Sequence, residues 1–138
     1  LDNWIGEKIK ELENEGLLEK TIVVFYSDHG GPLPRQKRLL YDSGLKVPLI
    51  IRYPNKERSG DRDGRLVSFV DFPPTVLSMA GIKAPSFMQG QAFEGKFRST
   101  RDREFIHGHA DRFDESVDMI RAVRSKKFKQ TINQYRTR

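Results

Sequence analysis

The sequence has no cysteine, and that absence narrows what these 138 residues can do. They can form no disulfide framework, no thiolate metal site and no cysteine nucleophile. Long apolar runs are missing as well. The longest, Ile22 to Tyr26, is far too short to cross a bilayer, so we expect no membrane span. Internal repeats and low-complexity tracts are also absent, and neither a signal peptide nor a transit peptide is visible in these residues. With 36% hydrophobic and 32% charged residues, the composition is typical of one soluble globular domain.

The chain also lacks an excess of acidic residues. It carries 25 Lys and Arg against 19 Asp and Glu, a formal net charge of +6. Residues 1–95 hold 13 basic and 13 acidic side chains, whereas residues 96–138 hold 12 and 6, so the whole excess lies in the last third. Such a bias suits an anionic polysaccharide, a nucleic acid or simply a solvated face. Because no nucleic-acid-binding motif accompanies it, we expect no nucleic-acid partner.

The first part of the chain predicts an α/β arrangement. Apolar residues at helical spacing from Ile5 to Leu12 indicate a helix, capped by Asp2 or Asn3 and ended by Gly16. Two apolar runs without alternation follow, at 21–27 and 47–53, and each is typical of a strand covered on both faces.

A second helix should begin at a Pro-Pro pair and stop at Gly81. Helix, strand, strand and helix in this order suggest part of an α/β sheet. Residues 83–103 show little periodicity and predict a connector that joins two units or serves a site. Strand-like stretches follow at 103–110 and 118–125, and a turn at 125–127 would lead into a third at 128–134. We therefore expect a small antiparallel unit that begins near residue 100.

The letters SDHGG stand directly after the first predicted strand. Ligands of open α/β sheets collect at the carboxyl ends of strands, so Asp28 and His29 lie where a site would form. Gly30 and Gly31 would let the backbone turn away. A carboxylate beside an imidazole can bind a cation, and the Lys37 ammonium could reach an anion held on it, as sulfuryl or phosphoryl transfer requires. The simpler alternative is that Asp28 starts a turn and His29 is a surface residue.

Several stretches together resemble the sulfatase family of the alkaline phosphatase superfamily. They are TIVVFYSDHGG with a lysine after it, LYDSGLKVPLIIRYP, VSFVDFPPTVLSMAGI and, in the tail, EFIHGHA and IRAVRSKKFK. In that family a strand ends in Ser/Thr-Asp-Asn/His-Gly, and a helix begins with Asp-hydrophobic-x-Pro-Thr. The resemblance implies an α/β fold class: the end of a large sulfatase-type sheet domain over residues 1–99, then part of a small antiparallel β-rich subdomain over residues 100–138.

The resemblance also implies roles for single residues. Asp28 resembles a calcium-ligating carboxylate, and His29 stands where the family has its Asn or His metal ligand. Lys37 resembles the catalytic lysine that contacts the sulfate oxygens, with Arg38 and Lys46 as nearby alternatives. Ca²⁺ is therefore the expected metal. Mn²⁺ or Zn²⁺ are alternatives, because imidazole suits such cations better than it suits Ca²⁺.

The family's nucleophile, however, is missing from this sequence. It is a formylglycine made in a Cys/Ser-x-Pro/Ala-x-Arg motif, and no such motif occurs here. The paired aspartates that end the family's first strand are absent too. We therefore expect the C-terminal part of a sulfatase, inactive alone and dependent on the N-terminal remainder of the same enzyme. By the same resemblance, its location is periplasmic, secreted or lysosomal.

The implied reaction is hydrolysis of sulfate esters or N-sulfate groups on a sulfated small molecule or glycan. The passage GGPLPRQKRLLYDSG resembles the heparan N-sulfatase (sulfamidase-like) branch. In the tail, His107 and His109 should share one face of a strand and Arg112 should follow in a loop. His109 and Arg112 could then contact an anionic sugar, or the histidines could lie on a solvated or domain-facing strand. Two other functions stay open: a phosphodiester or phosphonate monoester hydrolase of the same superfamily, and a non-catalytic polyanion-binding module.

Overall fold

The computed structural model describes residues 1–113 and 115–133. The chain divides into two compact units, Leu1–Arg62 and Asp63–Arg138, and each is described by itself. The first unit contains a helix, a two-stranded antiparallel pair and short helical turns. The second contains a helix, a long connector and a three-stranded antiparallel sheet.

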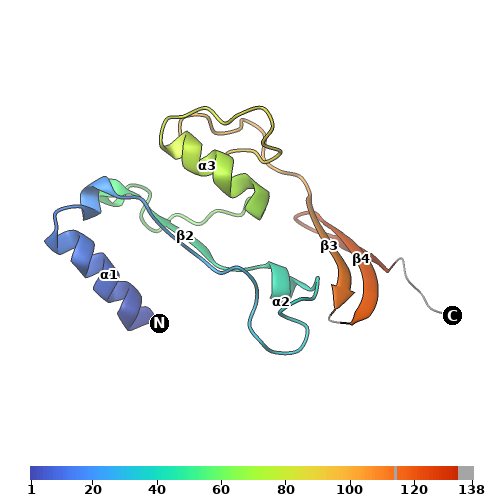
Figure 1. Ribbon diagram of the computed structural model, residues 1–138. Helices are drawn as coiled ribbons and strands as arrows, with labels where there is room; N and C mark the ends of the chain where they lie inside the picture. Colours follow the sequence, from blue (N-terminus) through green and yellow to red (C-terminus); the bar gives the residue numbers. More distant parts are fainter. Residues whose placement is uncertain (114, 134–138) are drawn as a thin grey trace. The chain divides into compact units, whose positions relative to one another are not determined.

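The predicted first helix is confirmed as α1 (Asp2–Asn14; Figure 1). Its N-cap is Leu1, so the capping interpretation of Asp2 or Asn3 was wrong. Asp2 instead lies in the first turn, where a negative charge faces the positive end of the helix dipole. Gly16 follows the helix with a φ of 65°, a left-handed conformation that costs glycine little and lets the chain leave the helix.

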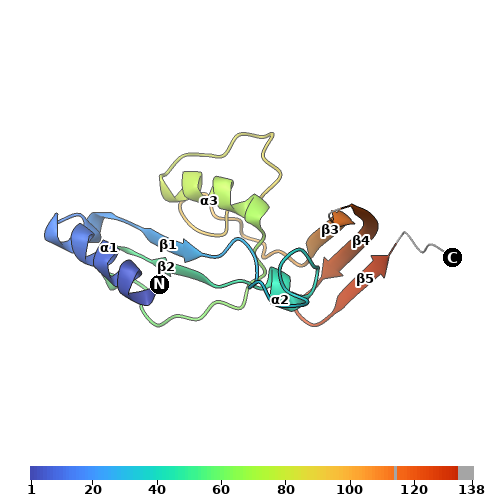
Figure 2. The same ribbon diagram turned by 60° about the horizontal axis from the view of Figure 1, so that its bottom comes forward.

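The two predicted strands of the first unit pair with each other. β1 (Val23–Tyr26) runs antiparallel to β2 (Leu49–Arg52), with Tyr26 opposite Leu49 (Figure 2). The expected cover on both faces is not supplied by the described residues, because Val24, Tyr26 and Ile50 remain exposed. An apolar ribbon of this kind needs further strands or helices against it.

A salt bridge connects the turn before β1 to the end of β2. Glu19, in the 3₁₀ turn η1 (Leu18–Lys20), lies 2.7 Å from Arg52 (Glu19 Oε1 to Arg52 Nη2) and also accepts a hydrogen bond from the Asn55 backbone N–H. Arg52 also donates from Nη1 to the Leu18 carbonyl, at 3.0 Å. The hydrogen bond from Arg52 is the main reason that the pKa of Glu19 is lowered from its usual 4.5.

In the second unit, α3 (Phe72–Met79) starts at the Pro-Pro pair as predicted, and Gly81 follows with a φ of 74°. Its buried side chains are polar as well as apolar. Thr75 donates to the Asp71 carbonyl at 2.6 Å and accepts from the Phe93 N–H at 3.0 Å. Ser78 accepts from the Phe97 N–H at 2.8 Å. The connector, irregular as expected, is thus fastened along the helix (Figure 1).

Asp71 is the centre of this arrangement. Its carboxylate accepts backbone N–H bonds from Ser68 at 3.0 Å and Gln91 at 2.9 Å, and it forms a two-point ion pair with the Arg103 guanidinium, whose Nε lies 2.8 Å away. The residue is only 1% exposed. Three segments that are distant in sequence therefore meet on one buried carboxylate, which is satisfied by donors on each side.

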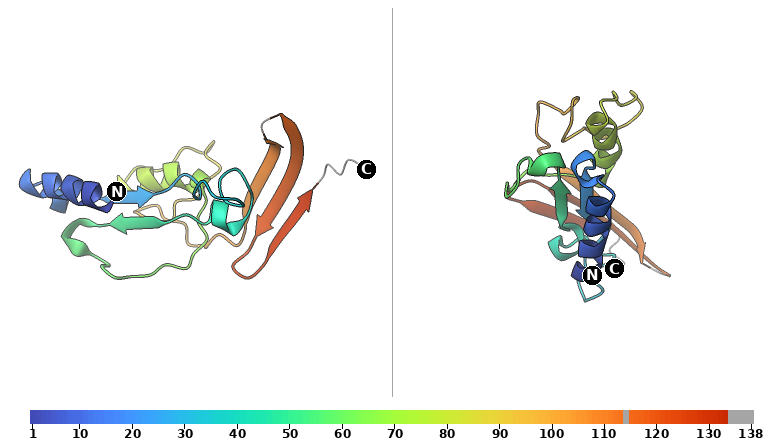
Figure 3. Two further views of the ribbon diagram at one scale, coloured as in Figure 1. Left: turned by 90° about the horizontal axis from the view of Figure 1, so that it is seen from below. Right: turned by 90° about the vertical axis from the view of Figure 1, so that its left-hand side faces the viewer.

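The small antiparallel sheet has the order β3–β4–β5: β3 (Ile106–Phe113), β4 (Ser116–Arg124) and β5 (Lys129–Asn133; Figure 3). The predicted turn is confirmed, because Ser125 N–H donates to the Phe128 carbonyl at 2.8 Å. Gln134, expected in the last strand, lies outside the described residues. Arg112 was predicted in a loop, and this was wrong: it lies inside β3 opposite Val117, because the strand continues past Ala110 through a register shift.

Among the described residues, no helix is both long and apolar enough to cross a membrane.

Candidate functional site

Asp28 and His29 converge directly after β1. Their side chains approach to 3.4 Å between Asp28 Oδ2 and His29 Nε2, while the other carboxylate oxygen accepts the His29 backbone N–H at 2.9 Å. The Asp28 side chain is 81% exposed, whereas that of His29 is 40% exposed and therefore partly covered. Adjacent oxygen and nitrogen donors of this kind can ligate one cation.

The imidazole is already oriented for ligation. His29 Nδ1 lies 2.7 Å from the Gly30 carbonyl oxygen. A carbonyl can only accept, so Nδ1 must carry the proton in this contact, and in the neutral ring Nε2 keeps its lone pair. A backbone carbonyl that fixes the tautomer of a ligating histidine is a common support of metal sites. The Ser27 hydroxyl, which donates to the His29 carbonyl at 2.6 Å, holds the same turn.

This pair fits part of a metal site. Within residues 1–113 and 115–133, no group of three or more His, Cys, Asp or Glu side chains is arranged to hold an ion. Ca²⁺ takes 6–8 oxygen ligands in general, so Asp28 and His29 would supply only a share of them. The donor set therefore suits a cation whose remaining ligands come from elsewhere.

The loop after the pair is folded back by close backbone contacts. Gly30 N–H donates to the Gly44 carbonyl at 3.0 Å. A Cβ at Gly30 would lie 1.9 Å from the Ser43 carbonyl oxygen, and one at Gly44 would lie 2.2 Å from the Gln36 carbonyl oxygen. Glycine is needed at position 30 for this close approach; the turn that we predicted for Gly30 and Gly31 involves no positive φ at either.

Lys37 belongs to this folded loop. Its backbone N–H donates to the Gly31 carbonyl at 3.1 Å, which brings position 37 back toward the strand end. The side chain is exposed, and within the described part of the chain no carboxylate pairs with its ammonium. Arg35 and Arg38 on either side have φ values of 64° and 70°, unusual for residues other than glycine. The lysine is thus an available positive charge in a constrained loop.

The alternatives for the anion-binding role lie nearby in sequence. Arg38 follows Lys37 directly, and Lys46 comes just after the short helix α2 (Asp42–Leu45) with its backbone N–H 2.7 Å from the Asp42 carbonyl. Tyr41 is the N-cap of α2, and its ring centroid lies 5.9 Å from the Arg35 guanidinium carbon.

The predicted tail residues belong to the second unit. His107 and His109 are exposed and lie on one face of β3, opposite Val123 and Arg121 of β4. Strand alternation places Arg112 on the other face from His109. The structure therefore does not bring His109 and Arg112 together on one surface of the sheet.

Sequence reasoning missed the ion pairs of the second unit. Arg65 pairs with Asp63, and its Nη2 lies 2.6 Å from Glu94 Oε1. Hydrogen bonding to Asp63 is the main cause that raises the pKa of Arg65. The sequence could have pointed to Asp71, because this residue begins the Asp-hydrophobic-x-Pro-Thr motif. No sequence motif marked its partner Arg103, which lies 32 residues later.

A carboxylate and an oriented imidazole at the end of a strand, followed by an available lysine in a folded-back loop, are suited to metal-assisted chemistry on an anion. The sequence profile of the family described as Sulfatase matches residues 1–82, more than half of the chain. This chain belongs to the sulfatase family.

Individual relatives agree with that assignment. An ulvan-active sulfatase from Formosa agariphila is 57% identical over 129 residues, which cover 94% of this chain and 22% of that protein. An N-acetylglucosamine-6-O-sulfatase from Bacteroides thetaiotaomicron is 34% identical over 140 residues, which cover 94% of this chain and 25% of that protein. The chain therefore spans about a quarter or less of the length of these curated relatives.

The similarity does not single out the sulfamidase-like branch. Human N-sulphoglucosamine sulphohydrolase is 35% identical over 88 residues, which cover 63% of this chain and 18% of that protein. That is a lower identity over a shorter stretch than the ulvan-active relative shows. The chain is thus assigned to the sulfatase family as a whole and not to the sulfamidase-like branch that we expected.

The fold class is confirmed by a solved structure. The crystal structure of the protein yidJ from Bacteroides fragilis, which carries the provisional name of a sulfatase, superposes with a TM-score of 0.77 at 24% identity. The match covers 96% of this chain and 30% of that one. A mixed α/β part followed by a small antiparallel sheet is therefore an arrangement that this chain shares with a known fold.

Proposed function

We propose that this chain is the C-terminal part of a sulfatase that removes sulfate groups from a sulfated polysaccharide. The observation that carries the proposal is the convergence of Asp28 and His29 to 3.4 Å at the end of β1, with the imidazole oriented by the Gly30 carbonyl. Family membership and relatives that are named for ulvan and for N-acetylglucosamine 6-O-sulfate support the same class of substrate.

In this proposal Asp28 and His29 hold a divalent cation, Ca²⁺ in the first instance. The cation, when bound, would polarise the sulfate group and offset its negative charge. Asp28 contributes an anionic oxygen and His29 its Nε2 lone pair. Backbone hydrogen bonds from Gly30 to Gly44 and from Lys37 to Gly31 fold the loop back toward the strand end. The proposal assigns to the Lys37 ammonium the sulfate oxygens and the charge that develops on them.

The nucleophile and the remaining metal ligands would come from the rest of the enzyme. We propose the division made above, with residues 1–99 completing the catalytic α/β domain and residues 100–138 contributing to the small subdomain. His109 is proposed to contact the glycan from the exposed face of β3. Arg112, on the opposite face by alternation, would act separately from it.

The imidazole of His29 favours one alternative function. Because histidine suits Mn²⁺ or Zn²⁺ better than Ca²⁺, a phosphodiester or phosphonate monoester hydrolase of the same superfamily would use the same two residues. Turnover of an aryl phosphodiester without turnover of any sulfate ester would replace the sulfatase proposal by this one. Whether the sulfatase acts on O-sulfate or N-sulfate is decided in the same assay, by offering both kinds of sulfated glucosamine.

The test of the metal role is Asp28→Ala in the full-length enzyme. A ligating carboxylate has no substitute in the loop, so we expect loss of most bound metal together with activity. Glu57→Ala, which removes an exposed carboxylate from the same unit, is the matched control and should keep both. Metal content, measured by elemental analysis of the purified variants, gives the answer without reference to turnover. Unchanged metal in Asp28→Ala would contradict the assignment.

A further inference from the structure

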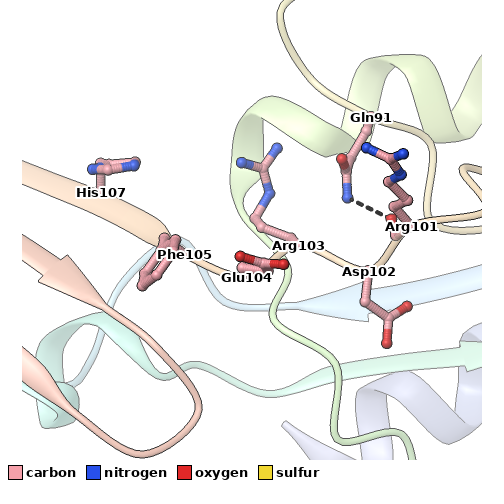
Figure 4. A pocket seen from close by; sticks show the side chains of 7 residues that line it. All are labelled: Gln91, Arg101, Asp102, Arg103, Glu104, Phe105 and His107. Atoms are coloured by element: carbon pink, nitrogen blue, oxygen red, sulfur yellow. Dashed lines mark hydrogen bonds between the residues drawn. The ribbon is translucent and has the colours of Figure 1, made fainter.

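The second unit contains a pocket of about 580 Å³ at the point where the connector enters β3 (Figure 4). Its walls include two basic residues, Arg101 and Arg103, and two acidic ones, Asp102 and Glu104. Phe105, His107 and Gln91 complete the lining. The pocket is an open depression rather than an enclosed cavity.

The two arginines of the pocket differ in their ion-pair partners within the chain. Arg103 is held by the buried carboxylate of Asp71 and forms a fixed part of the wall. Arg101 is exposed, and among residues 1–113 and 115–133 no carboxylate pairs with its guanidinium. Only its backbone is engaged, because its carbonyl accepts from Gln91 Nε2 at 3.3 Å and from Ser99 Oγ at 2.9 Å. Among the described residues, the Arg101 guanidinium is therefore a cation without an ion-pair partner.

The other groups of the pocket limit what the ligand can be. Glu104 has no partner in the described part of the chain, and the Asp102 carboxylate has only Lys126 nearby, at 4.0 Å. Two such carboxylates repel a densely charged anion such as a polyphosphate. They accept hydrogen bonds readily from hydroxyl groups. A suitable ligand combines several hydroxyls with a single anionic group.

An aromatic face and a hydrogen-bonding ring complete the pattern. Phe105 is 48% exposed at the pocket, and His107 lies near it at the start of β3 (Figure 4). The ring of Phe105 can pack against the apolar face of a sugar, while His107 can donate or accept a hydrogen bond. A basic rim continues from Lys126 to Lys127 in the turn before β5, and it would attract the rest of a negatively charged chain.

We propose that this pocket binds one charged sugar residue of a polysaccharide, a uronic acid or a sulfated sugar, by an ion pair with Arg101 and by packing on Phe105. The proposal rests on the polysaccharide substrate proposed above. Asp28, His29 and Lys37 belong to the first unit and the pocket to the second. The proposal assigns to the pocket a residue of the polymer other than the one whose sulfate is removed.

The test compares two substrates of the full-length enzyme, ulvan and a small aryl sulfate. Arg101→Ala should raise KM for ulvan by about tenfold or more, as expected for loss of a hydrogen bond to a charged group, and should leave the aryl sulfate unchanged. Phe105→Ala should raise KM for ulvan several-fold. The matched controls are Arg98→Ala, an exposed arginine of the same connector outside the pocket, and Phe87→Ala, a ring that is 79% exposed. Both should behave as wild type on both substrates.

Equal losses on the two substrates would place Arg101 in the reaction centre and overturn the proposal, and so would normal kinetics of both pocket variants on ulvan. A binding measurement separates this inference from the sulfatase activity itself. In affinity gel electrophoresis with ulvan in the gel, the wild type and controls should be retarded and Arg101→Ala should migrate faster. That result supports the pocket even if no sulfate is released. Equal retardation of all variants, or stronger competition by single-stranded DNA than by ulvan, would contradict it.

Discussion

At the scale of single residues, the candidate site depends on groups whose local contacts select one chemical state. The Gly30 carbonyl fixes the His29 tautomer and leaves on Nε2 the lone pair that the proposal assigns to the metal. Asp28 keeps one oxygen on the His29 backbone and turns the other toward the imidazole. Lys37 is a positive charge near them in sequence. Within the part of the chain that the structure describes, no ion pair of its exposed ammonium has to break before it can bind an anion.

The charge of Lys37 leads to a prediction about the rate. In the full-length enzyme, Lys37→Ala should lower kcat by roughly a hundredfold or more, as for loss of a preorganised electrostatic donor. Lys46→Ala, which removes an exposed lysine from the same loop region, should stay within a few-fold of wild type. Both are measured with an aryl sulfate under saturating conditions. A larger effect at Lys46 than at Lys37, or at Arg38 in a parallel variant, would move the role to that residue.

At the scale of elements, buried polar side chains determine how the second unit is assembled. Asp71, Thr75 and Ser78 are fully buried along α3 and its approach, and each accepts a backbone N–H or an arginine from the connector. An irregular segment can lie against a helix only if its backbone groups find such partners. The connector is thus part of the folded unit rather than a free linker.

Removal of the Asp71 carboxylate should test this assembly. Asp71→Ala leaves the half-buried Arg103 and two backbone N–H groups without their acceptor, and we expect a loss of about 3–5 kcal/mol in the free energy of unfolding. Asp102→Ala, which removes an exposed carboxylate 4.0 Å from Lys126, should cost less than about 1 kcal/mol. Urea titration of the full-length variants measures both. Similar midpoints for the two variants would show that Asp71 does not organise the unit.

The Glu19–Arg52 bridge gives the first unit a pH-dependent component of stability. The pKa of Glu19 is lowered in the folded state, so the bridge stabilises fully above pH 4.5, the usual pKa, and its contribution is lost as the pH falls through the lower folded value. Glu19→Gln should therefore lower Tm at pH 7. The difference in Tm between this variant and the wild type should disappear as the pH falls below 4.5. Glu57→Gln serves as control. A difference in Tm between Glu19→Gln and wild type that stays constant across this pH range would rule out the ionic contribution of the Glu19–Arg52 bridge.

At the scale of the whole molecule, the described residues include apolar side chains that are left exposed. Val24, Tyr26 and Ile50 are exposed on the two-stranded pair, and a pair of strands alone is at best marginally stable in water. Trp4 of α1 is 59% exposed. The relatives that this chain matches are about four times longer or more, so further chain is available in such proteins to cover these surfaces.

Residues 1–138 produced alone should therefore behave unlike the full-length enzyme. We expect the isolated chain to bind the dye ANS, to self-associate and to hydrolyse no aryl sulfate, because its apolar faces are open and its sequence has no family nucleophile motif. Size-exclusion chromatography, ANS fluorescence and a turnover assay measure the three properties. The full-length protein is the control for each. A monomeric isolated chain that releases sulfate would refute this expectation.

Local patterns in the sequence determined the elements and the candidate residues. Helical spacing placed α1, apolar runs placed β1 and β2, the Pro-Pro pair placed the start of α3, and the SDHGG stretch at a strand end placed Asp28 and His29. These signals suffice because they depend on neighbours within a few residues, through side-chain periodicity, capping and turn chemistry. The extent of β3 was missed, because a register shift carries the strand through residues that resemble a loop.

Only the tertiary structure decided the contacts between distant segments. It joined Asp71 to Arg103 and Glu19 to Arg52, required glycine at position 30 through the Ser43 carbonyl, and formed the pocket beside Arg101. No local pattern encodes such contacts, since each depends on how the backbone brings residues that are far apart in sequence within a few ångströms of each other. The physical reason is that burial and close packing are properties of the folded chain, and the same side chain is a surface residue or a buried anchor according to what is packed against it.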